Sequence, residues 1–456
     1  MSKPRPLPAG PLIGFYGDDF TGSSAAMEAT AFAGLATVLF LSTPTPQRLR
    51  DFAGYRVIGV AGVARAQNPA WMNEHLPPVF DLLTATGAPV IHYKVCSTFD
   101  SAPQIGSIGH AIDIAAARFG GWTPMIVADP GMGRYQAVGN LFAAAHGAVH
   151  RLDRHPVMAR HPITPMDEAD LARHLAKQTA RKIGLVDFVA IKHGEADARL
   201  TQELATGAEI VSIDVLDTQT LIEAGRLVWE RGACPTFGVG SQGVEAALVA
   251  YWCHAGLIPP QAAPKRARAV DRIACVSGSV SPVTAKQIAH ARDNGFATIA
   301  LDTARAVDGS EWTRETGRAV DAALLQLGNG HDVLVYSAAG PDDPAVAAFK
   351  TAVAAAGAAV EAVNERIGTG LGAILDRILV ETAITRVVIS GGDTSGRAAS
   401  MLGIDALTAI APLAPGAPLC RAHAARLDRD GLEIALKGGQ VGAPDFFVAA
   451  KRGGAS

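Results

Sequence analysis

The chain has 456 residues, enough for two large α/β domains or for roughly three domains of ~150 residues each. Its formal net charge is −3 and charged residues make up 18% of it, which argues against a nucleic-acid partner and against electrostatic attraction to a membrane. Apolar residues make up 49%, so the chain can bury large cores and is not disordered.

Cysteine usage indicates the compartment. The five cysteines are odd in number, widely spread and free of any Cys-x-x-Cys pair, which fits a reducing cytoplasm and argues against a disulfide framework or a zinc ribbon. Residues 1–6 lack the apolar core of a signal peptide. The longest mostly apolar stretch, residues 29–41, is interrupted by Gly34 and is too short to span a bilayer. We therefore expect a cytoplasmic protein.

Short β-branched runs alternate with alanine-rich stretches, a pattern typical of βαβ units in mostly parallel sheets. The strands expected in the first part are 12–16, 37–41, 57–61, 90–94, 125–128, 188–191, 210–214 and 236–239. Those expected in the second part are 273–276, 298–301, 333–336, 359–363 and 387–389.

A segment rich in proline, small residues and basic charge separates the two series of strands, as a linker does. We predict an α/β protein with two domains, residues 1–258 and 270–456, joined by a linker at 259–269. Each domain is expected to contain a mostly parallel sheet flanked by helices. A ligand-binding cleft is expected between the two domains, because domain boundaries are common sites.

Two adjacent acids, Asp18 and Asp19, lie in the sequence Gly-Asp-Asp-Phe-Thr-Gly at 17–22. This motif joins the first expected strand to a helix expected at 23–29, so the acids lie at the carboxyl end of a strand, where ligands bind in open α/β sheets. One carboxylate can accept a proton from a substrate hydroxyl, and the other can hold a hydroxyl or magnesium, or cap the helix. We predict that one aspartate caps the helix and that the other is functional.

Cations and hydroxyls follow other expected strands of the first domain. These candidates for binding the substrate are Lys94, Ser97, Thr98, Asp100, Arg65 and Arg134. Lys94 can bind an anionic substrate group, or it can pair with Asp100 and be neutralised. Arginine suits bidentate recognition of a carboxylate.

Three small-residue turns in the second domain favour a phosphate, since backbone N–H groups and a helix N-terminus attract anions. The candidate residues are Ser277, Gly278, Ser279, Gly391, Gly392, Asp393, Thr394 and Gly439. No Gly-x-x-x-x-Gly-Lys-[Ser/Thr] sequence occurs, so the chain is not an ordinary P-loop protein.

One Gly-x-Gly-x-x-Gly sequence, Gly238–Gly243, follows an expected strand and precedes a helix. It would suit a dinucleotide, but the acid expected about 20 residues later is missing and the motif closes the domain instead of opening it. A nicotinamide-dependent oxidoreductase therefore stays an alternative, and so does a non-catalytic protein that binds small carboxylates.

In sequence and in order, these motifs resemble those of the four-carbon acid sugar kinase family. Besides the acid pair, the motifs that carry the resemblance are Lys-Val-Cys-Ser-Thr-Phe-Asp at 94–100, Gly-Gly-Asp-Thr-Ser-Gly at 391–396 and Leu-Lys-Gly-Gly-Gln-Val-Gly at 436–442. Members of this family phosphorylate 3-oxo-tetronate, threonate or erythronate with ATP. The resemblance covers nearly the whole chain. It implies an N-terminal domain that binds the sugar acid and a C-terminal domain that binds ATP.

Carried over by motif, the resemblance implies ATP contacts at Ser277, at 391–394 and at Gly439. It implies sugar-acid contacts from the Asp18–Asp19 turn, from Arg65 and from the turn at 94–100. The expected activity is the transfer of phosphate from ATP, with Mg²⁺, to a terminal hydroxyl of a small sugar acid. Neither the metal ligands nor the oligomeric state follow from the sequence, and a homodimer stays open.

Three segments depart from the family pattern. Tyr16-Gly17 precedes the acid pair, Ala61-Gly62-Val63-Ala64-Arg65 replaces a more polar segment, and Gly106-Ser107-Ile108-Gly109 replaces a Gly-Asn-Ile-Gly turn. These departures leave the exact sugar acid open, and a branch that acts on a branched relative, 3-oxo-isoapionate, is one of the alternatives.

Overall fold

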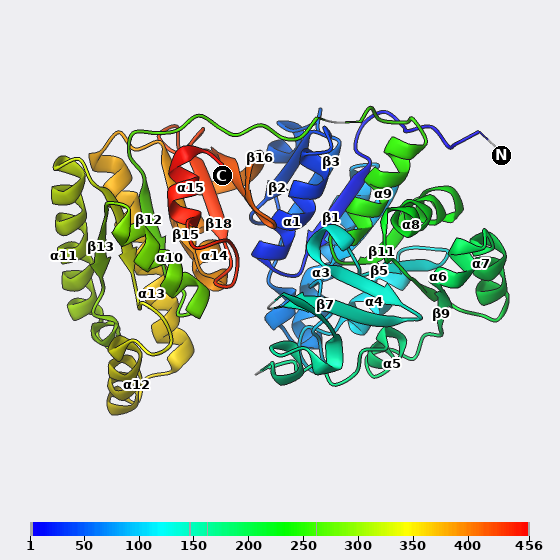
Figure 1. Ribbon diagram of the computed structural model, residues 1–456, viewed down its shortest axis with the longest axis horizontal. Coiled ribbons are helices and arrows are strands. Elements are labelled where there is room, and N and C mark those ends of the chain that lie inside the picture. The colour runs from blue at the N-terminus through cyan, green and yellow to red at the C-terminus, as the bar shows by residue number, and fades with distance from the viewer. Residues whose placement is uncertain (1–2, 146, 162, 261, 455–456) are drawn as a thin grey trace. The chain divides into compact units, whose positions relative to one another are not determined.

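The computed structural model describes residues 3–145, 147–161, 163–260 and 262–454 (Figure 1). The chain forms two compact units, Met1–Ala262 and Ala263–Ser456. Each unit is an α/β structure with a mostly parallel sheet, so the predicted fold class is confirmed. Within the described ranges, no helix combines the length and the apolar character needed to cross a membrane.

The first unit is built on a parallel sheet with the strand order β2-β3-β1-β4-β11-β5-β10-β9. Its strands are β1 Ile13–Gly17, β2 Thr37–Phe40, β3 Val57–Ala61, β4 Val90–Lys94, β5 Thr123–Ile126, β9 Ile183–Val186, β10 Ile210–Ile213 and β11 Thr236–Gly240. Every residue of β1, β3, β4 and β11 is buried, as expected for central parallel strands that are covered on both faces.

The helices of the first unit are α1 Phe20–Ala31, α2 Pro46–Arg50, α3 Pro69–Ala85, α4 Ile108–Ala116, α5 Leu171–Leu175, α6 Phe188–Lys192, α7 Ala196–Ala205, α8 Thr218–Arg231 and α9 Gly243–His254. A small antiparallel sheet adds β6 Arg134–Ala137, β7 Asn140–Ala145 and β8 Ala148–Arg151. The buried carboxylate of Asp214 fixes this sheet to the end of β10, because it accepts hydrogen bonds from the N–H groups of Val138 (2.5 Å) and Gly139 (3.0 Å).

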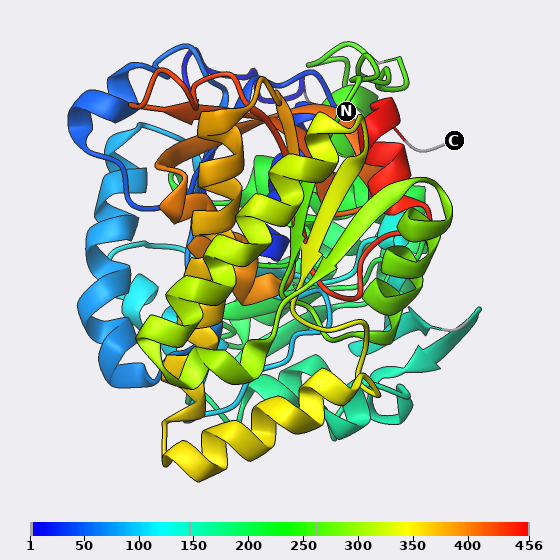
Figure 2. The same cartoon turned by 90° about the vertical axis from the view of Figure 1, so that its left-hand side faces the viewer.

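The second unit has the strand order β13-β14-β12-β15-β18-β17-β16, parallel from β13 to β18 and antiparallel beyond. Its strands are β12 Ala274–Ser277, β13 Phe296–Ala300, β14 Asp332–Tyr336, β15 Arg386–Ser390, β16 Ile404–Ala414, β17 Ala417–Ala424 and β18 Glu433–Lys437. Its helices are α10 Pro282–Asp293, α11 Gly309–Gly328, α12 Pro344–Ala356, α13 Val360–Glu381, α14 Gly392–Met401 and α15 Phe446–Arg452. Figure 2 shows α11 and α13 side by side over one face of this sheet.

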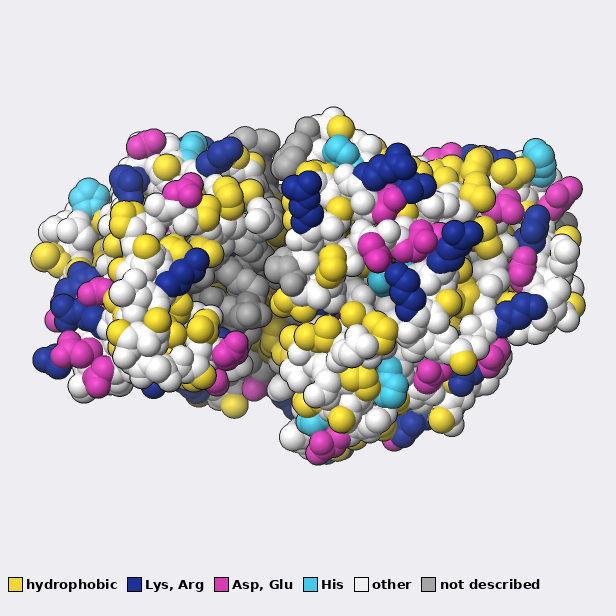
Figure 3. All heavy atoms as spheres, turned by 90° about the horizontal axis from the view of Figure 1, so that it is seen from below, with side chains coloured by type: hydrophobic (Ala, Val, Ile, Leu, Met, Phe, Trp, Pro, Cys, Tyr) yellow, Lys and Arg dark blue, Asp and Glu magenta, His cyan; other side chains and the backbone are white. Residues whose placement is uncertain are grey.

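Two expected strands are helices instead. Residues 188–191 lie in α6, because the carboxylate of Asp187 accepts a hydrogen bond from the N–H of Ala190 (2.9 Å) and caps a helix there. Residues 359–363 lie at the start of α13, whose buried Val363 and Ile367 are four residues apart, the spacing of a helix face. On the face shown in Figure 3, cationic and anionic side chains are interspersed, in line with the near-neutral net charge.

Candidate active site

The acid pair lies where three neighbouring strands of the first unit end together. Gly17, the last residue of β1, is in register with Ala61 of β3 and with Lys94 of β4. The chain beyond these ends is joined by backbone hydrogen bonds, from the Asp18 N–H to the Lys94 carbonyl (2.9 Å) and from the Arg65 N–H to the Asp18 carbonyl (3.1 Å). The parallel register therefore gathers Asp18, Arg65 and Lys94 at one edge of the sheet.

Arg65 contacts both aspartates. Its Nη2 and Nε donate to the two oxygens of Asp18 (2.6 and 3.1 Å), and its Nη2 and Nη1 donate to the two oxygens of Asp19 (2.8 and 2.9 Å). Burial opposes the charge of this guanidinium, but the two carboxylates outweigh it and raise the pKa of Arg65 well above its ordinary value. Arg65 is therefore an ion-pair partner of the two aspartates in the structure, although the sequence analysis predicted it as a substrate contact.

The two aspartates have different surroundings. Asp19 caps α1, because its Oδ1 accepts a hydrogen bond from the Gly22 N–H (2.9 Å), and its side chain is 28% exposed. The side chain of Asp18 is only 4% exposed. Burial raises the pKa of Asp18 above its ordinary value, with a further contribution from the charge of Asp19, while Arg65 opposes the rise.

Lys94 lies against Asp19 and not against Asp100. Its buried ammonium is 4.0 Å from Asp19 Oδ1, and the described residues include no ion pair between Lys94 and Asp100. A Cβ atom on Gly22 would overlap both Lys94 Nζ and Asp19 Oδ1. A glycine at position 22 thus lets the ammonium approach the first turn of α1.

The turn after β4 is held by its own side chains. The Thr98 hydroxyl donates to Asp100 Oδ1 (2.8 Å), and Cys96 Sγ lies 3.0 Å from the Thr98 hydroxyl. Burial alone would raise the pKa of Asp100, but the charge of Arg65 and the hydrogen bonds within the turn hold that pKa below its ordinary value. Burial and the charge of Asp100 raise the pKa of the Cys96 thiol to about 11, so this cysteine is a neutral thiol.

Arg134, at the start of β6, is a third cation at the site, after Arg65 and Lys94. Its Nε donates to the Ser97 hydroxyl (3.3 Å), and its Nη1 donates to the carbonyls of Met132 (3.2 Å) and Gly133 (3.3 Å). Among the described residues, no carboxylate forms an ion pair with Arg134. Burial lowers the pKa of Arg134, which remains far above neutrality for an arginine. Its charge is thus available to an anion.

A further group supports the turn and was not expected from the sequence. His174 of α5 lies with Nε2 3.0 Å from the Ser101 hydroxyl, which also accepts a hydrogen bond from Gln178 (2.8 Å). His174 and Gln178 follow Ser101 by more than 70 positions and form no sequence motif with it. Only the tertiary structure brings them beside Asp100.

In the second unit, three glycine turns converge. A Cβ atom on Gly278 would overlap the Thr394 hydroxyl, and one on Gly439 would overlap the Ser279 hydroxyl. Gly391 has φ +124°, a conformation that favours glycine. The buried Ser277 hydroxyl accepts a hydrogen bond from the Ser279 N–H (3.4 Å).

A cavity of about 470 Å³ opens beside these turns. Its lining includes most of the residues expected to bind the nucleotide, namely Gly278, Ser279, Gly391, Gly392, Thr394 and Gly439. The backbone of Asp393 lies in α14, but its side chain falls outside the described structure. The turns therefore border one cavity at the carboxyl ends of β12, β15 and β18.

Lys437, the last residue of β18, was not predicted as part of the site. Its ammonium is fully buried and donates to the Thr284 hydroxyl (3.3 Å) and to the Gly438 carbonyl (3.0 Å). Burial lowers the pKa of Lys437 to about 8. The signal was present in the sequence, since Lys437 directly precedes Gly438-Gly439.

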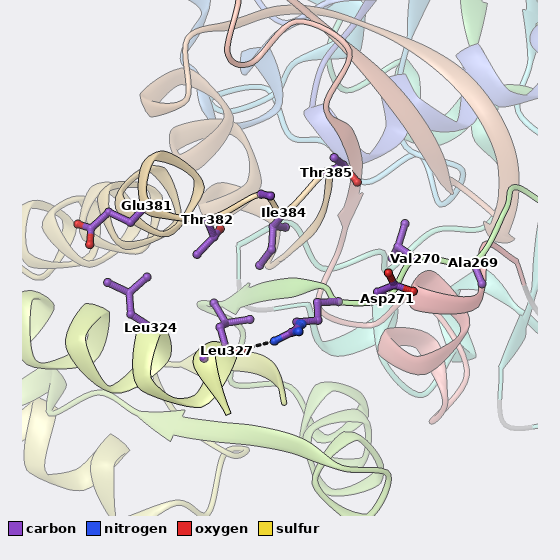
Figure 4. A pocket seen from close by; sticks show the side chains of 12 residues that line it. Ala269, Val270, Asp271, Leu324, Leu327, Glu381, Thr382, Ile384 and Thr385 are labelled. Carbon is purple, nitrogen blue, oxygen red and sulfur yellow. Dashed lines mark hydrogen bonds between the residues drawn. The ribbon is translucent and has the colours of Figure 1, made fainter. Parts of the chain in front are cut away.

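A larger cavity, of about 720 Å³, lies elsewhere in the second unit (Figure 4). Its lining includes Arg272 and Thr385, just before β12 and β15, and Leu327 near the end of α11, whose carbonyl accepts a hydrogen bond from Arg272. This cavity is thus at the amino ends of the strands, opposite the glycine turns, and includes none of the predicted site residues.

The Gly238–Gly243 motif is used for packing. A Cβ atom on Gly240 would overlap the carbonyl of Ile126, and one on Gly243 would overlap the carbonyl of Ala128. These glycines therefore let β11 and α9 approach β5 and the chain that follows it, which explains the motif without a dinucleotide.

Comparisons with known proteins agree with this division of the chain. Residues 13–248 match a family model described as a sugar-binding N-terminal domain, and residues 274–447 match one described as a nucleotide-binding C-terminal domain. A 3-oxo-isoapionate kinase of Paraburkholderia graminis is 51% identical over 98% of this chain and 95% of its own length. A 3-oxo-tetronate kinase of Burkholderia multivorans is 32% identical over 97% of each chain.

A solved structure of a Salmonella typhimurium LT2 protein is 25% identical to the chain, with a TM-score of 0.77 over 96% of this chain and 98% of that one. The two family models thus describe a chain with a sugar-binding domain followed by a nucleotide-binding domain. The chain belongs to the four-carbon acid sugar kinase family. The predicted family and the predicted class of enzyme, a sugar-acid kinase, are confirmed, and neither a nicotinamide-dependent oxidoreductase nor a non-catalytic binding protein is favoured.

Proposed function

We propose that this protein transfers the γ-phosphate of ATP to a hydroxyl of 3-oxo-isoapionate. The observation that carries the proposal is the 51% identity, over nearly the full length of both chains, to a 3-oxo-isoapionate kinase. Identity to 3-oxo-tetronate kinases of Cupriavidus necator and Burkholderia multivorans is 30% and 32%. The departures at 61–65 and 106–109 distinguish the chain from the 3-oxo-tetronate pattern.

In this proposal the substrate's carboxylate is bound by cations of the first unit. Arg65 is engaged by two aspartates, whereas Arg134 has no carboxylate partner among the described residues and lies beside Ser97. Arg134, with Ser97 and Thr98 for hydroxyls, is therefore our candidate for recognising the sugar acid. Arg65 then acts by holding the two aspartates in place.

We infer that Asp19 is the carboxylate that meets the reactive hydroxyl, because its side chain is 28% exposed and that of Asp18 is 4% exposed. Asp19 also caps α1, so this proposal gives one residue the two roles that the sequence prediction divided between the two aspartates. The hydroxyl oxygen attacks the γ-phosphorus, the bond from that phosphorus to the bridging oxygen breaks, ADP leaves, and the hydroxyl proton passes to Asp19. Phosphoryl transfer depends mainly on positioning and charge neutralisation. Asp18 contributes by fixing Arg65.

In the same proposal, ATP binds at the turns of the second unit, Gly278–Ser279, Gly391–Thr394 and Gly439. Mg²⁺ is expected to accompany the phosphates of ATP and to neutralise their charge. The described residues contain no group of three or more His, Cys, Asp or Glu side chains placed to hold a metal. Protein ligands for the metal are therefore not assigned.

The substrate is tested by ADP release with 3-oxo-isoapionate, 3-oxo-tetronates, threonate and erythronate. We expect kcat/KM to be at least about tenfold higher for 3-oxo-isoapionate, the discrimination that roughly 1.4 kcal/mol of binding provides. Turnover of a 3-oxo-tetronate at an equal or higher kcat/KM would assign another substrate, and absence of turnover with every sugar acid would reject the kinase.

The role of Asp19 is tested with Asp19→Asn, which keeps an oxygen to cap α1 and removes the negative charge. We expect kcat to fall by about 10²–10⁴, the usual contribution of a positioned acid or base. Asp18→Asn should lower kcat less, because it loosens Arg65 without removing the proton acceptor. Asp81→Asn, at an exposed ion pair with Arg118, is the matched control and should keep full activity. Near wild-type kcat in Asp19→Asn would refute the assignment.

A further inference from the structure

Lys437 carries a buried positive charge that the described side chains do not balance. Its ammonium is fully buried at the end of β18 and contacts the Thr284 hydroxyl and the Gly438 carbonyl. It also lies over the ring of Phe446, 5.8 Å from the ring centroid. No carboxylate among the described side chains pairs with it. A buried cation without a partner is unfavourable, so it needs a reason to be retained.

The contacts of Lys437 connect it to all three glycine turns. Thr284, which accepts from the ammonium, donates to the Gly439 carbonyl (2.9 Å), and its hydroxyl lies 3.0 Å from the Ser279 hydroxyl. The Lys437 carbonyl accepts a hydrogen bond from the Gly391 N–H (2.9 Å). Ser279, Gly391 and Gly439 all line the 470 Å³ cavity. Lys437 is thus connected through hydrogen bonds to residues from all three turns that line the cavity.

We propose that Lys437 is a positioning residue for the nucleotide, a fixed positive charge beneath the three turns that strengthens binding with each added phosphate charge. The inference rests on the proposed function, in which these turns hold ATP. Because the ammonium is buried, it acts through its field and through Thr284 and Gly438 and does not touch the nucleotide. Charges in such a setting interact more strongly than they do in water.

A purely structural lysine would behave differently. If Lys437 only held the turns together, its loss would weaken every ligand of the cavity equally, including adenosine, which has no phosphate. It would also destabilise the protein without nucleotide. A counter-charge instead predicts selective loss for phosphorylated ligands and an unchanged or raised melting temperature without nucleotide.

The test measures the affinities of adenosine, AMP, ADP and ATP by calorimetry for the full-length wild type and for Lys437→Met, which keeps the length and removes the charge. We expect adenosine to bind within about twofold of wild type and ATP at least about tenfold more weakly, with AMP and ADP between them. In turnover, KM for ATP should rise more than kcat falls. Lys286→Met is the matched control, because Lys286 is an exposed lysine of α10 outside the lining of the cavity, where salt screens its charge.

Equal weakening of adenosine and ATP, or unchanged ATP binding, would overturn the inference. If Lys437→Met does not fold, the pH dependence of nucleotide binding by the wild type tests the inference instead. Burial lowers the pKa of Lys437 to about 8, so the ammonium loses its charge between pH 7.5 and 9.5. The groups that face it, the Thr284 hydroxyl, the Phe446 ring and the Gly438 carbonyl, do not titrate near neutrality. The affinity of the wild type for ATP, relative to adenosine, should therefore fall over this pH interval. A constant ratio rejects the inference. Wild-type protein that binds ATP but phosphorylates no sugar acid rejects only the proposed function.

Discussion

The roles of single residues followed from their partners more than from their type. Arg65 was expected to bind the substrate, yet its guanidinium is shared between Asp18 and Asp19. Arg134 has the same side chain but contacts a hydroxyl and carbonyls, so no carboxylate among the described residues neutralises its charge. The difference between the two arginines comes from the register of β1 and β3, which no local motif encodes.

The titration of Lys437 predicts how stability depends on pH. In the folded protein its pKa is lowered to about 8, whereas in the unfolded chain it returns to its ordinary value near 10.4. Between these values the unfolded state binds more protons, so the free energy of unfolding rises with pH. The groups facing the ammonium, which belong to Thr284, Phe446 and Gly438, do not titrate in this window.

Urea unfolding without nucleotide, at pH 7.5 and 9.5, measures this effect as the difference between wild type and Lys437→Met. Wild type should gain about 2 kcal/mol relative to the variant over this interval. Subtracting the variant removes contributions from other groups. A difference that stays constant with pH would mean that the ammonium is solvated or paired.

At the scale of elements, the strand–turn–helix units were predictable and the rest was not. Strands β3 and β4 match the expected ranges, because short β-branched runs that are buried on both faces leave a clear pattern. Residues 188–191 carry similar apolar residues, but the cap at Asp187 makes them a helix. The hairpin strands β6 and β7 were missed because their support, the carboxylate of Asp214, is more than 70 residues away.

The β1–α1 unit gives a prediction about its glycine. Gly22 lies in the first turn of α1, where alanine would ordinarily favour the helix by up to about 1 kcal/mol. Here its Cβ would overlap Lys94 Nζ and Asp19 Oδ1, so Gly22→Ala must displace the ammonium or the carboxylate. We expect kcat/KM for the sugar acid to fall at least about 100-fold, as misplaced catalytic groups do, with ADP affinity unchanged.

Gly317→Ala is the control for this substitution. Gly317 lies within α11, and a Cβ atom added there would meet nothing within 4 Å beyond the helix's own backbone and its chain neighbours. The variant should keep full activity and gain up to about 1 kcal/mol of stability. Wild-type kcat/KM in Gly22→Ala would show that the close approach of Lys94 is not required.

At the scale of the whole molecule, the two chemical tasks belong to different units. The acid pair, Arg134 and the turn at 94–100 lie in the first unit, and the three glycine turns with Lys437 lie in the second. In each unit the carboxyl ends of parallel strands supply the groups. A ligand for either task is therefore expected to bind to one unit and to stabilise it by mass action.

Hydrogen exchange followed by mass spectrometry tests this division. ADP should protect the amides at 277–284, 391–396 and 438–442 most strongly, because their turns border the cavity. The sugar acid should instead protect 17–22 and 94–101, where the aspartates and the turn after β4 lie. At a concentration of 100 Kd each ligand adds about 2.7 kcal/mol to the stability of the state it binds, enough to slow exchange there about 100-fold if exchange requires that unit to open. Strongest protection of 17–22 by ADP would reverse the assignment of the two sites.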